Sequence, residues 1–266
     1  MITADPLVLR RDTDAVARLT LNQPASRNSL SLAMLEAIET ELAAVAVDRS
    51  IRAVVLDGEG PAFCAGHDLK EIQAHRNDPD RGRVFYEALL DRCAQVMLAI
   101  NALPQPVIAV VEGIATAAGC QLVAACDLAV AGEAARFCTP GVNLGLFCST
   151  PGVAIARNLA PKAAMEMLLL GEMVGAETAL RFGLINRITA KGEAMATATA
   201  LADQLAGRSA YALSLGKRTY YAQAGLPLAE AYREAGKAMA DNMLAADAAE
   251  GIDAFLTKRP PFWDNP

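Results

Sequence analysis

Short apolar runs and longer amphipathic segments alternate along the first part of the chain. Residues 53–56, 107–111 and 128–131 are short, uninterrupted apolar runs, which are typical of buried β-strands. Residues 8–10 and 16–21 flank a polar segment and predict a short β-hairpin. A further strand is expected to end near residues 185–188.

Helical periodicity fills the segments between these runs. Ser31 can cap a helix over residues 32–47, in which apolar residues recur every three or four positions. Helices are also expected over residues 83–101 and, after a glycine-containing turn, near residues 117–125. Because strands that alternate with helices pair in parallel, the pattern predicts an α/β fold whose helices cover a parallel sheet.

The pattern changes after residue 191, where helical periodicity continues without any intervening apolar run. The helices expected there cover residues 192–206, 209–224, 227–245 and 248–257. The sequence therefore predicts an α/β core over residues 1–191 and a C-terminal helical region over residues 192–266.

The charge balance and the scarcity of histidine exclude several functional classes. The 266 residues include 24 Lys+Arg and 30 Asp+Glu, a net charge of −6, which leaves no broad basic surface for nucleic acid. The two histidines, His67 and His75, are too few for a three-histidine zinc site, and no metal is expected. A Ser-His-Asp hydrolase is also disfavoured, because the sequence has no G-x-S-x-G segment.

The cysteines and the N-terminal residues indicate a reducing, intracellular compartment. None of the six cysteines forms a C-x-x-C pair, and their apolar surroundings predict buried, reduced thiols. The first residues lack the basic and apolar regions of a signal peptide, and no mitochondrial targeting is evident. Residues 107–131 are interrupted by Glu112, Gln121 and Asp127, so no membrane span is expected. We therefore expect a cytoplasmic location if the protein is bacterial.

Two loops rich in small residues follow predicted strands and precede predicted helices, at residues 63–71 and 111–121. Small side chains let a ligand approach the backbone, and the start of a helix has unpaired N–H groups. Two such loops side by side could direct two N–H groups at one oxygen, forming an oxyanion hole for an activated acyl group. The alternative is that both are ordinary tight turns between packed elements.

An ordered set of motifs makes the sequence similar to the crotonase superfamily, the enoyl-CoA hydratase/isomerase family. The matching segments are P-A-S-R-N-S-L at 24–30, F-C-A-G-H-D-L at 63–69, P-V-I-A at 106–109 with Gly113, C-D-L-A at 126–129, G-L-I at 183–185 and A-F-L-T-K-R at 254–259. The resemblance implies the crotonase (ClpP-like) ββα spiral core with a C-terminal helical region. It also implies a homotrimer or a hexamer built as a dimer of trimers, and a coenzyme A thioester as substrate with no permanently bound cofactor.

The resemblance assigns roles by position within these motifs. The backbone N–H groups of His67 and Ala118 would form the oxyanion hole. The residues that match coenzyme A positions are Arg27, Ser29, Ala65, Gly66, Asp68, Leu69, Lys70, Gly119 and Lys258, and the last is a position that a neighbouring subunit can supply. Structural explanations also fit some of them. Asp68 with Glu71 suits an N-cap and capping box, and Lys70 suits a solvated charge. The His67 ring is either catalytic or only placed at the mouth of the site, and His75 looks like a surface residue.

Two positions depart from the hydratase pattern that the resemblance implies. In familiar hydratases two carboxylates share the proton transfers, and here Gln121 and Gly141 stand in their places. A carboxamide does not titrate near neutral pH and glycine has no side chain, so the usual mechanism lacks its base. Gln121 and Asn143 remain as candidate polar groups of the pocket. Cys148 is a candidate nucleophile only if its pKa is lowered, and is otherwise a packed thiol.

The segments around these departures resemble one subgroup of the family, the enoyl-CoA hydratase domain-containing proteins of the third type. The expectation is therefore an acyl-CoA-binding protein, nominally a hydratase or isomerase, with weak or absent classical hydratase activity. The alternatives are a non-catalytic acyl-CoA-binding or regulatory protein and a Cys148-dependent acyl-CoA thioesterase.

Overall fold

The main sheet of the computed structural model, which describes residues 5–263, carries the predicted strands. Its strand order is β1-β2-β3-β5-β7-β10. The strands are β1 (Val8–Thr13), β2 (Val16–Leu21), β3 (Ala53–Gly58), β5 (Val107–Val111), β7 (Leu128–Gly132) and β10 (Arg187–Thr189). Only the hairpin partners β1 and β2 pair antiparallel, and the other neighbouring strands are parallel.

A second, smaller sheet was not predicted from the sequence. It has the order β4-β6-β8-β9 and contains β4 (Ala62–Cys64), β6 (Ile114–Thr116), β8 (Arg136–Cys138) and β9 (Val174–Gly175). Strands of the two sheets follow each other along the chain as β3-β4, β5-β6 and β7-β8, and a helix comes next each time. This repeated ββα unit is the spiral core that the resemblance implied.

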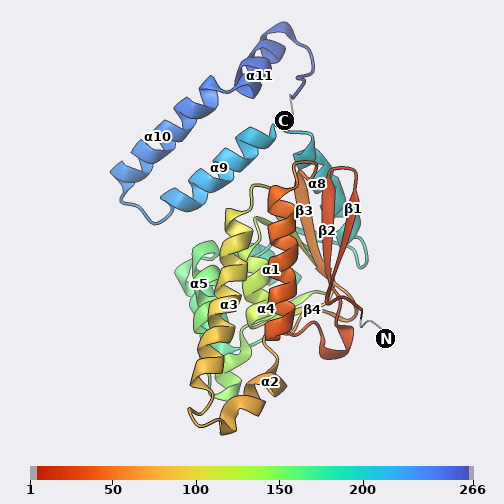
Figure 1. The fold of residues 1–266 in the computed structure, drawn as a ribbon, viewed down its shortest axis with the longest axis vertical. Helices are drawn as coiled ribbons and strands as arrows, with labels where there is room; N and C mark the ends of the chain where they lie inside the picture. Colours follow the sequence, from red (N-terminus) through yellow and green to blue (C-terminus); the bar gives the residue numbers. More distant parts are fainter. Residues whose placement is uncertain (1–4, 264–266) are drawn as a thin grey trace.

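Helices cover both faces of the main sheet (Figure 1). Helix α1 (Leu32–Val47) packs beside α3 (Arg83–Ala102), and α4 (Ala118–Ala125) lies against α3 and the small sheet. These helices share one apolar core with side chains from both sheets. Helix α8 (Ala194–Ala206) covers the opposite face, where it packs against β3, β5 and β7.

Four further helices complete the part of the core around the small sheet. They are α2 (Leu69–Ala74), α5 (Ser149–Asn158), α6 (Pro161–Leu170) and α7 (Ala176–Phe182). Only the start of α2 was expected from the sequence, with Asp68 as its N-cap, and the other three helices were not predicted. Helix α5 begins at Ser149 and contains Pro151 in its first turn. Proline is tolerated in the first turn of a helix, where its missing N–H would be unpaired in any case.

Helices α9 (Ala210–Gln223), α10 (Leu228–Leu244) and α11 (Ala246–Thr257) extend away from the sheets (Figure 1). Helix α9 is attached to the core by Lys217, whose side chain is only 7% exposed. Its ammonium donates hydrogen bonds to the carbonyl oxygens of Ile100 and Gln105 and to Asp127 Oδ2, at 2.8, 3.0 and 2.6 Å. Because all three of its donors are satisfied, this buried charge fixes α9 against the ends of the strands.

The predicted elements agree closely with the observed ones in the parallel core. Ser31 caps α1 by accepting a hydrogen bond from the Met34 N–H, as expected. The strand at 107–111 has the predicted bounds, and β1 is three residues longer than predicted because the hairpin turns at Asp14. All six cysteines are free and buried, which confirms the prediction for them. Among the described residues, no helix has the length and apolar character to cross a membrane.

Candidate functional site

The two loops that the sequence singled out lie against each other. Thr116 Oγ1 donates a hydrogen bond to the carbonyl oxygen of Ala65 at 3.0 Å. A methyl group placed on Gly66 would lie 3.2 Å from the backbone nitrogen of Ala118, so the two backbones are in direct contact there. Gly66 also has a φ of +86°, which glycine adopts without strain. The structure therefore brings the residue before His67 next to Ala118.

The backbone N–H groups of His67 and Ala118 are the next feature of this contact between the loops. Leu30 donates to the Gly66 carbonyl at 2.8 Å and accepts from the Asp68 N–H at 3.4 Å. His67 lies between these two partners, so its own N–H points to the opposite side of the segment, away from Leu30. Neither this N–H nor that of Ala118 has a hydrogen-bond acceptor in the described part of the chain.

Unusual backbone geometry positions Ala118 at the start of α4. The preceding residue, Ala117, has φ 50° and ψ −119°, a conformation that costs a non-glycine residue about 1–3 kcal/mol. Its N–H donates to the Cys138 carbonyl at 2.9 Å, which holds the turn in place. Gly119 packs so closely that an added Cβ would lie 2.2 Å from the Cys64 carbonyl oxygen. Strand β4 therefore lies directly against the first turn of α4.

A third segment, residues 24–30, supports the first loop from the other side. The Arg27 carbonyl accepts a hydrogen bond from the Ala65 N–H at 3.0 Å. The buried Asn28 side chain donates to the carbonyls of Ala62 and Phe63, at 2.9 and 3.2 Å, and also to that of Glu59. Asn28 was expected only as part of a motif, and its positioning role was not predicted from the sequence. Asparagine tolerates the left-handed backbone that Asn28 adopts, with a φ of 53°, so an asparagine in a polar loop is the signal in the sequence that could have indicated it.

Asp68 acts as the N-cap of α2, as expected. Its Oδ1 accepts hydrogen bonds from the N–H groups of Lys70 and Glu71, at 2.8 and 3.2 Å, and Ser29 Oγ donates to its Oδ2 at 3.2 Å. The second half of the predicted capping box is wrong, because the Glu71 carboxylate accepts from the Leu32 N–H instead. Glu71 thus stabilises the start of α1, where an acidic side chain is favourable.

Three basic side chains, Arg27, Lys70 and Lys258, are exposed and have no carboxylate within 4.0 Å in the described residues. Arg27 belongs to the third segment, where its carbonyl bonds the first loop, and Lys70 and the exposed Leu69 lie within the first loop at the start of α2. Lys258 follows α11, which lies at the opposite end of the molecule from α2 (Figure 1). The structure brings Arg27 and Lys70 to one region, and Lys258 of the same chain is not near them.

The two polar candidates beyond the loops lie in different surroundings. Gln121 is 5% exposed and belongs to α4, one turn after Ala118. Its Oε1 lies 4.0 Å from the Cys93 thiol, a weak donor. Asn143 is exposed, and its side-chain amide donates to the Gly171 carbonyl at 3.2 Å. Gln121 therefore lies one turn after Ala118 with its side chain directed toward Cys93 on α3, and the Asn143 side chain is bonded to Gly171.

The position of Gly141 leaves no room for a side chain. An added Cβ would lie 2.8 Å from Cys148 Sγ and 2.9 Å from the Leu146 carbonyl oxygen. Burial raises the pKa of Cys148, and it raises those of Cys120 and Cys138 to about 12 and about 11. These thiols are therefore protonated at neutral pH, and none of them is an activated nucleophile in this state.

The His67 ring is held by the backbone of the third segment. Its Nδ1 lies 3.2 Å from the Leu30 carbonyl oxygen. A carbonyl only accepts hydrogen bonds, so Nδ1 carries the proton and Nε2 of the neutral ring is an acceptor. Nε2 is buried and has no partner among the described residues. Burial also lowers the pKa of this imidazole, which favours its neutral form.

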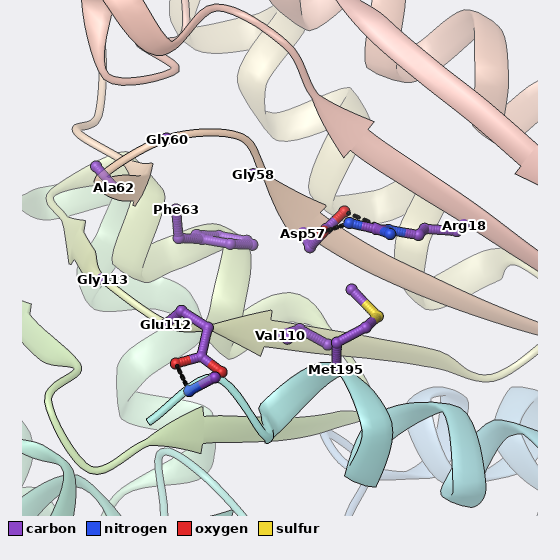
Figure 2. A pocket seen from close by; sticks show the side chains of 11 residues that line it. Arg18, Asp57, Gly58, Gly60, Ala62, Phe63, Val110, Glu112, Gly113 and Met195 are labelled. Atoms are coloured by element: carbon purple, nitrogen blue, oxygen red, sulfur yellow. Dashed lines mark hydrogen bonds and ion pairs between the residues drawn. The ribbon is translucent and has the colours of Figure 1, made fainter. Parts of the chain in front are cut away.

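A separate cavity of about 170 Å³ lies between β3, β5 and the start of α8 (Figure 2). Arg18 forms an ion pair with Asp57 on one side of it. On the other side, the Glu112 carboxylate accepts hydrogen bonds from the N–H groups of Gly192 and Ala194, at 3.1 and 3.0 Å. These charged groups already have partners, so they act as structural links. Among residues 5–263, no three His, Cys, Asp or Glu side chains form a group suited to a metal ion.

Comparisons with known proteins give a consistent family. The family model described as enoyl-CoA hydratase/isomerase matches residues 11–266. The mitochondrial enoyl-CoA hydratase domain-containing protein 3 of Rattus norvegicus is 42% identical over 259 residues, which are 97% of this chain and 85% of that protein. The crystal structure of the human enoyl-CoA hydratase domain-containing protein 3 has a TM-score of 0.91 and 42% identity, covering 97% of this chain and 100% of the other.

The crystal structure of an enoyl-CoA hydratase from Mycobacterium smegmatis is similar as well. It has 51% identity and a TM-score of 0.92, and the match covers 97% of this chain and 99% of that one. The similarity thus extends over both sheets and the C-terminal helices. The similar proteins include enoyl-CoA hydratase domain-containing protein 3, the subgroup that the sequence motifs resembled. The chain belongs to the enoyl-CoA hydratase/isomerase family.

Proposed function

We propose that this protein binds an acyl-CoA thioester and holds the thioester oxygen between the N–H groups of His67 and Ala118. The observation that carries this proposal is the pair of N–H groups at the contact between the two loops, for which the described residues offer no acceptor. An oxygen that gains negative charge as an enolate forms is stabilised by two such donors. The binding determinants would be the exposed Arg27 and Lys70 for the phosphates, together with the small residues of the first loop.

The classical hydratase reaction is not part of this proposal. Gln121 is not a base, and the close contact of Gly141 with Cys148 leaves no room for a carboxylate at that position. The activity proposed is therefore enolate stabilisation without carboxylate-assisted addition of water. A purely acyl-CoA-binding protein is the second candidate, and the same missing carboxylates support it.

Binding that depends on the carbonyl group tests the proposal. Butyryl-CoA has a thioester oxygen, whereas S-butyl-CoA is a thioether of the same chain length without that oxygen. Two hydrogen bonds of about 0.5–1.5 kcal/mol each predict a Kd for butyryl-CoA that is roughly 5- to 150-fold lower in titration calorimetry. Equal Kd values for the two ligands would exclude the oxyanion hole.

Two activity assays separate the candidate functions. Hydration of crotonyl-CoA is expected to stay far below an ordinary turnover of about 10 per second. Mass spectrometry of a mixed acyl-CoA pool after incubation distinguishes an enzyme from a binder, because only an enzyme changes the mass or the isomer. A thioesterase that depends on Cys148 predicts CoA release that Cys148→Ala abolishes. The raised pKa of the thiol argues against this alternative.

The C-terminal helices are proposed to form a homotrimer, or a hexamer of two trimers. Large apolar side chains on α10 and α11 are exposed in the single chain, namely Tyr232, Met239, Met243, Leu244, Ile252, Phe255 and Leu256. Contact with a neighbouring subunit would remove them from water, and it would let that subunit supply Lys258 to the site. Light scattering after size exclusion should give three or six times the chain mass of 27.9 kDa. A monomer would refute this arrangement.

A further inference from the structure

A larger cavity, of about 550 Å³, lies at the end of α1 that is remote from the two loops. It is lined by the end of α1 and the segment that follows, by residues 104–106, and by the first turns of α9 and α11. Helix α1 begins beside the first loop, where the Leu30 N–H donates to the Gly66 carbonyl, and its 16 residues span about 24 Å. The cavity is therefore separate from the amide pair, and its volume is typical of sites for small molecules.

One side chain of this cavity is a buried cation without a carboxylate partner. Arg52 is only 8% exposed, and no carboxylate oxygen of the described residues lies within 4.0 Å of its guanidinium. Its Nη2 donates to the Arg208 carbonyl at 2.7 Å, whereas its Nε and Nη1 have no acceptor in the described chain. Neither nitrogen is enclosed by protein, because the two enclosed side-chain polar atoms without a partner belong to His67 and Gln105. Arg52 therefore offers free donors to the cavity that it lines.

The charge of Arg52 needs a partner that the surrounding side chains do not supply. A guanidinium stays protonated in proteins, so its burial costs free energy unless an anion compensates for it. Burial lowers the pKa of Arg52, and the charge of Asp247, which lines the same cavity, opposes this shift. The Asp247 carboxylate, however, accepts a hydrogen bond from the Ser209 hydroxyl and not from Arg52. An anionic group in the cavity would satisfy the free donors of the guanidinium.

The first turn of α11 favours the same sign of charge in a ligand. Its N-cap, Ala245, has no side chain that caps the helix, and the N–H groups of Ala246 and Asp247 have no acceptor among residues 5–263. The start of a helix carries the positive end of the helix dipole, where an anion is stabilised. The exposed Arg49 lines the cavity as well. The buried arginine and the helix start thus point independently to an anion.

The rest of the lining selects one kind of anion. Apolar surface makes up much of the cavity, from Ile51, Pro104, Pro106, Tyr211 and Leu213. Such a surface suits an organic molecule and not an inorganic ion. Two carboxylates also line the cavity, those of Asp48 and Asp247, so a doubly charged phosphate would be repelled more strongly than a singly charged group. A carboxylate carries a single charge and matches the planar fork of a guanidinium.

We propose that this cavity binds an organic monocarboxylate, whose carboxylate accepts hydrogen bonds from Arg52 and whose apolar body lies against the apolar lining. The bound molecule would stand between the end of α1 and the starts of α9 and α11, and would connect the C-terminal helices to the core. None of the residues assigned to acyl-CoA lines this cavity. The inference is therefore independent of the proposed function.

Titration calorimetry with octanoate and octanol tests the requirement for a charge. Both molecules have the same eight-carbon chain, but only octanoate has a carboxylate. Hydrogen bonds to a charged group predict that octanoate binds roughly 10- to 150-fold more tightly than octanol. An excess of butyryl-CoA should leave the Kd for octanoate unchanged, because the two sites share no residue.

Three substitutions locate the site. Arg52→Met should weaken the binding of octanoate roughly 10- to 150-fold and change that of octanol less than about threefold. Arg157→Met is the matched control, because Arg157 also donates to one carbonyl, that of Val153, but lies outside the cavity, and it should bind octanoate as the wild type does. Asp247→Asn removes a negative charge and keeps an acceptor for Ser209, so it should tighten the binding of octanoate roughly two- to fivefold.

Each outcome supports or overturns the carboxylate site. Equal Kd values for octanoate and octanol would show a cavity that binds only apolar chains, and a folded Arg52→Met with the wild-type Kd for octanoate would exclude the guanidinium. If Arg52→Met does not fold, Asp247→Asn decides, and an unchanged Kd in that variant overturns the proposal. Competition between octanoate and butyryl-CoA would place octanoate in the acyl site and overturn it as well.

Discussion

Replacing Ala118 by proline removes one of the two proposed oxyanion donors without removing a hydrogen bond of the fold. Ala118 is the first residue of α4, and its N–H has no acceptor among the described residues. Proline is favoured at the first helical position, because its fixed φ suits the helix and no intrahelical hydrogen bond is lost. The pyrrolidine ring would also occupy the direction in which the N–H now points. The substitution therefore acts on the site while α4 keeps its other contacts.

The expected magnitude differs between binding and chemistry. In the ground state the thioester carbonyl loses one of its two hydrogen bonds. The binding free energy then weakens by about 0.5–1.5 kcal/mol, so Kd should rise roughly two- to twelvefold. In the transition state the oxygen is nearly an oxyanion, and loss of one donor costs about 2.7–4 kcal/mol. Exchange of the α-protons of butyryl-CoA with D₂O, which passes through the enolate, should thus be about 100- to 1000-fold slower in Ala118→Pro, a much larger change than that in affinity.

A matched control exists at the start of another helix. Ala210 is the first residue of α9 and follows the N-cap Ser209, far along the chain from the two loops. Ala210→Pro should change neither exchange nor the preference for butyryl-CoA over S-butyl-CoA. Thermal unfolding of both variants checks that each is folded. The oxyanion assignment is refuted if Ala118→Pro is folded and exchanges α-protons at the wild-type rate.

Three further predictions concern stability. Lys217→Met should lower the free energy of unfolding by about 3–5 kcal/mol and the melting temperature by about 10 °C, because it breaks a buried ion pair. Lys237→Met breaks an exposed ion pair and should change the melting temperature little in calorimetry. Gly141→Ala should lower the free energy of unfolding in denaturant by about 1–3 kcal/mol, because the new methyl group meets Cys148, and Cys148→Ala in the same chain should restore part of this loss. Gly236→Ala has open space around it and should stabilise the protein. Burial raises the pKa of all six thiols above the ordinary value of 9.0, so these thiols lose their protons at a lower pH in the unfolded chain than in the folded protein. The free energy of unfolding should therefore fall above about pH 9, and a flat profile from pH 9 to 11 would contradict this.

The parallel core could be predicted because its signals are local. An apolar run such as residues 107–111 is long enough to indicate a buried strand. Ser31 marks the start of α1, because its side chain accepts a hydrogen bond from the N–H of Met34 only three residues later. The small sheet has strands of two or three residues, which are too short to show a periodicity. Their pairing depends on contacts between distant segments, such as that of β4 with β6.

The site was predictable as far as it depends on backbone groups. Small residues at the ends of β4 and β6 indicated the two loops, and the family resemblance assigned the amides of His67 and Ala118. The state of the side chains was not predictable, because it depends on partners far away in sequence. The ring of His67 is oriented by Leu30, 37 residues earlier, and Asn28 supports carbonyls more than 30 residues later.

The packing around Gly141 changes how its lost carboxylate is interpreted. From the sequence alone, a single Gly141→Glu substitution would be expected to supply a carboxylate at this position. In the structure Cys148 Sγ and the Leu146 carbonyl already occupy the space that the new side chain needs. A buried carboxylate beside thiols with raised pKa values would also lack charged or donor partners. Glycine at position 141 is therefore built into the packing of this chain, and under the proposed function any chemistry at the amide pair has to draw its base from another residue.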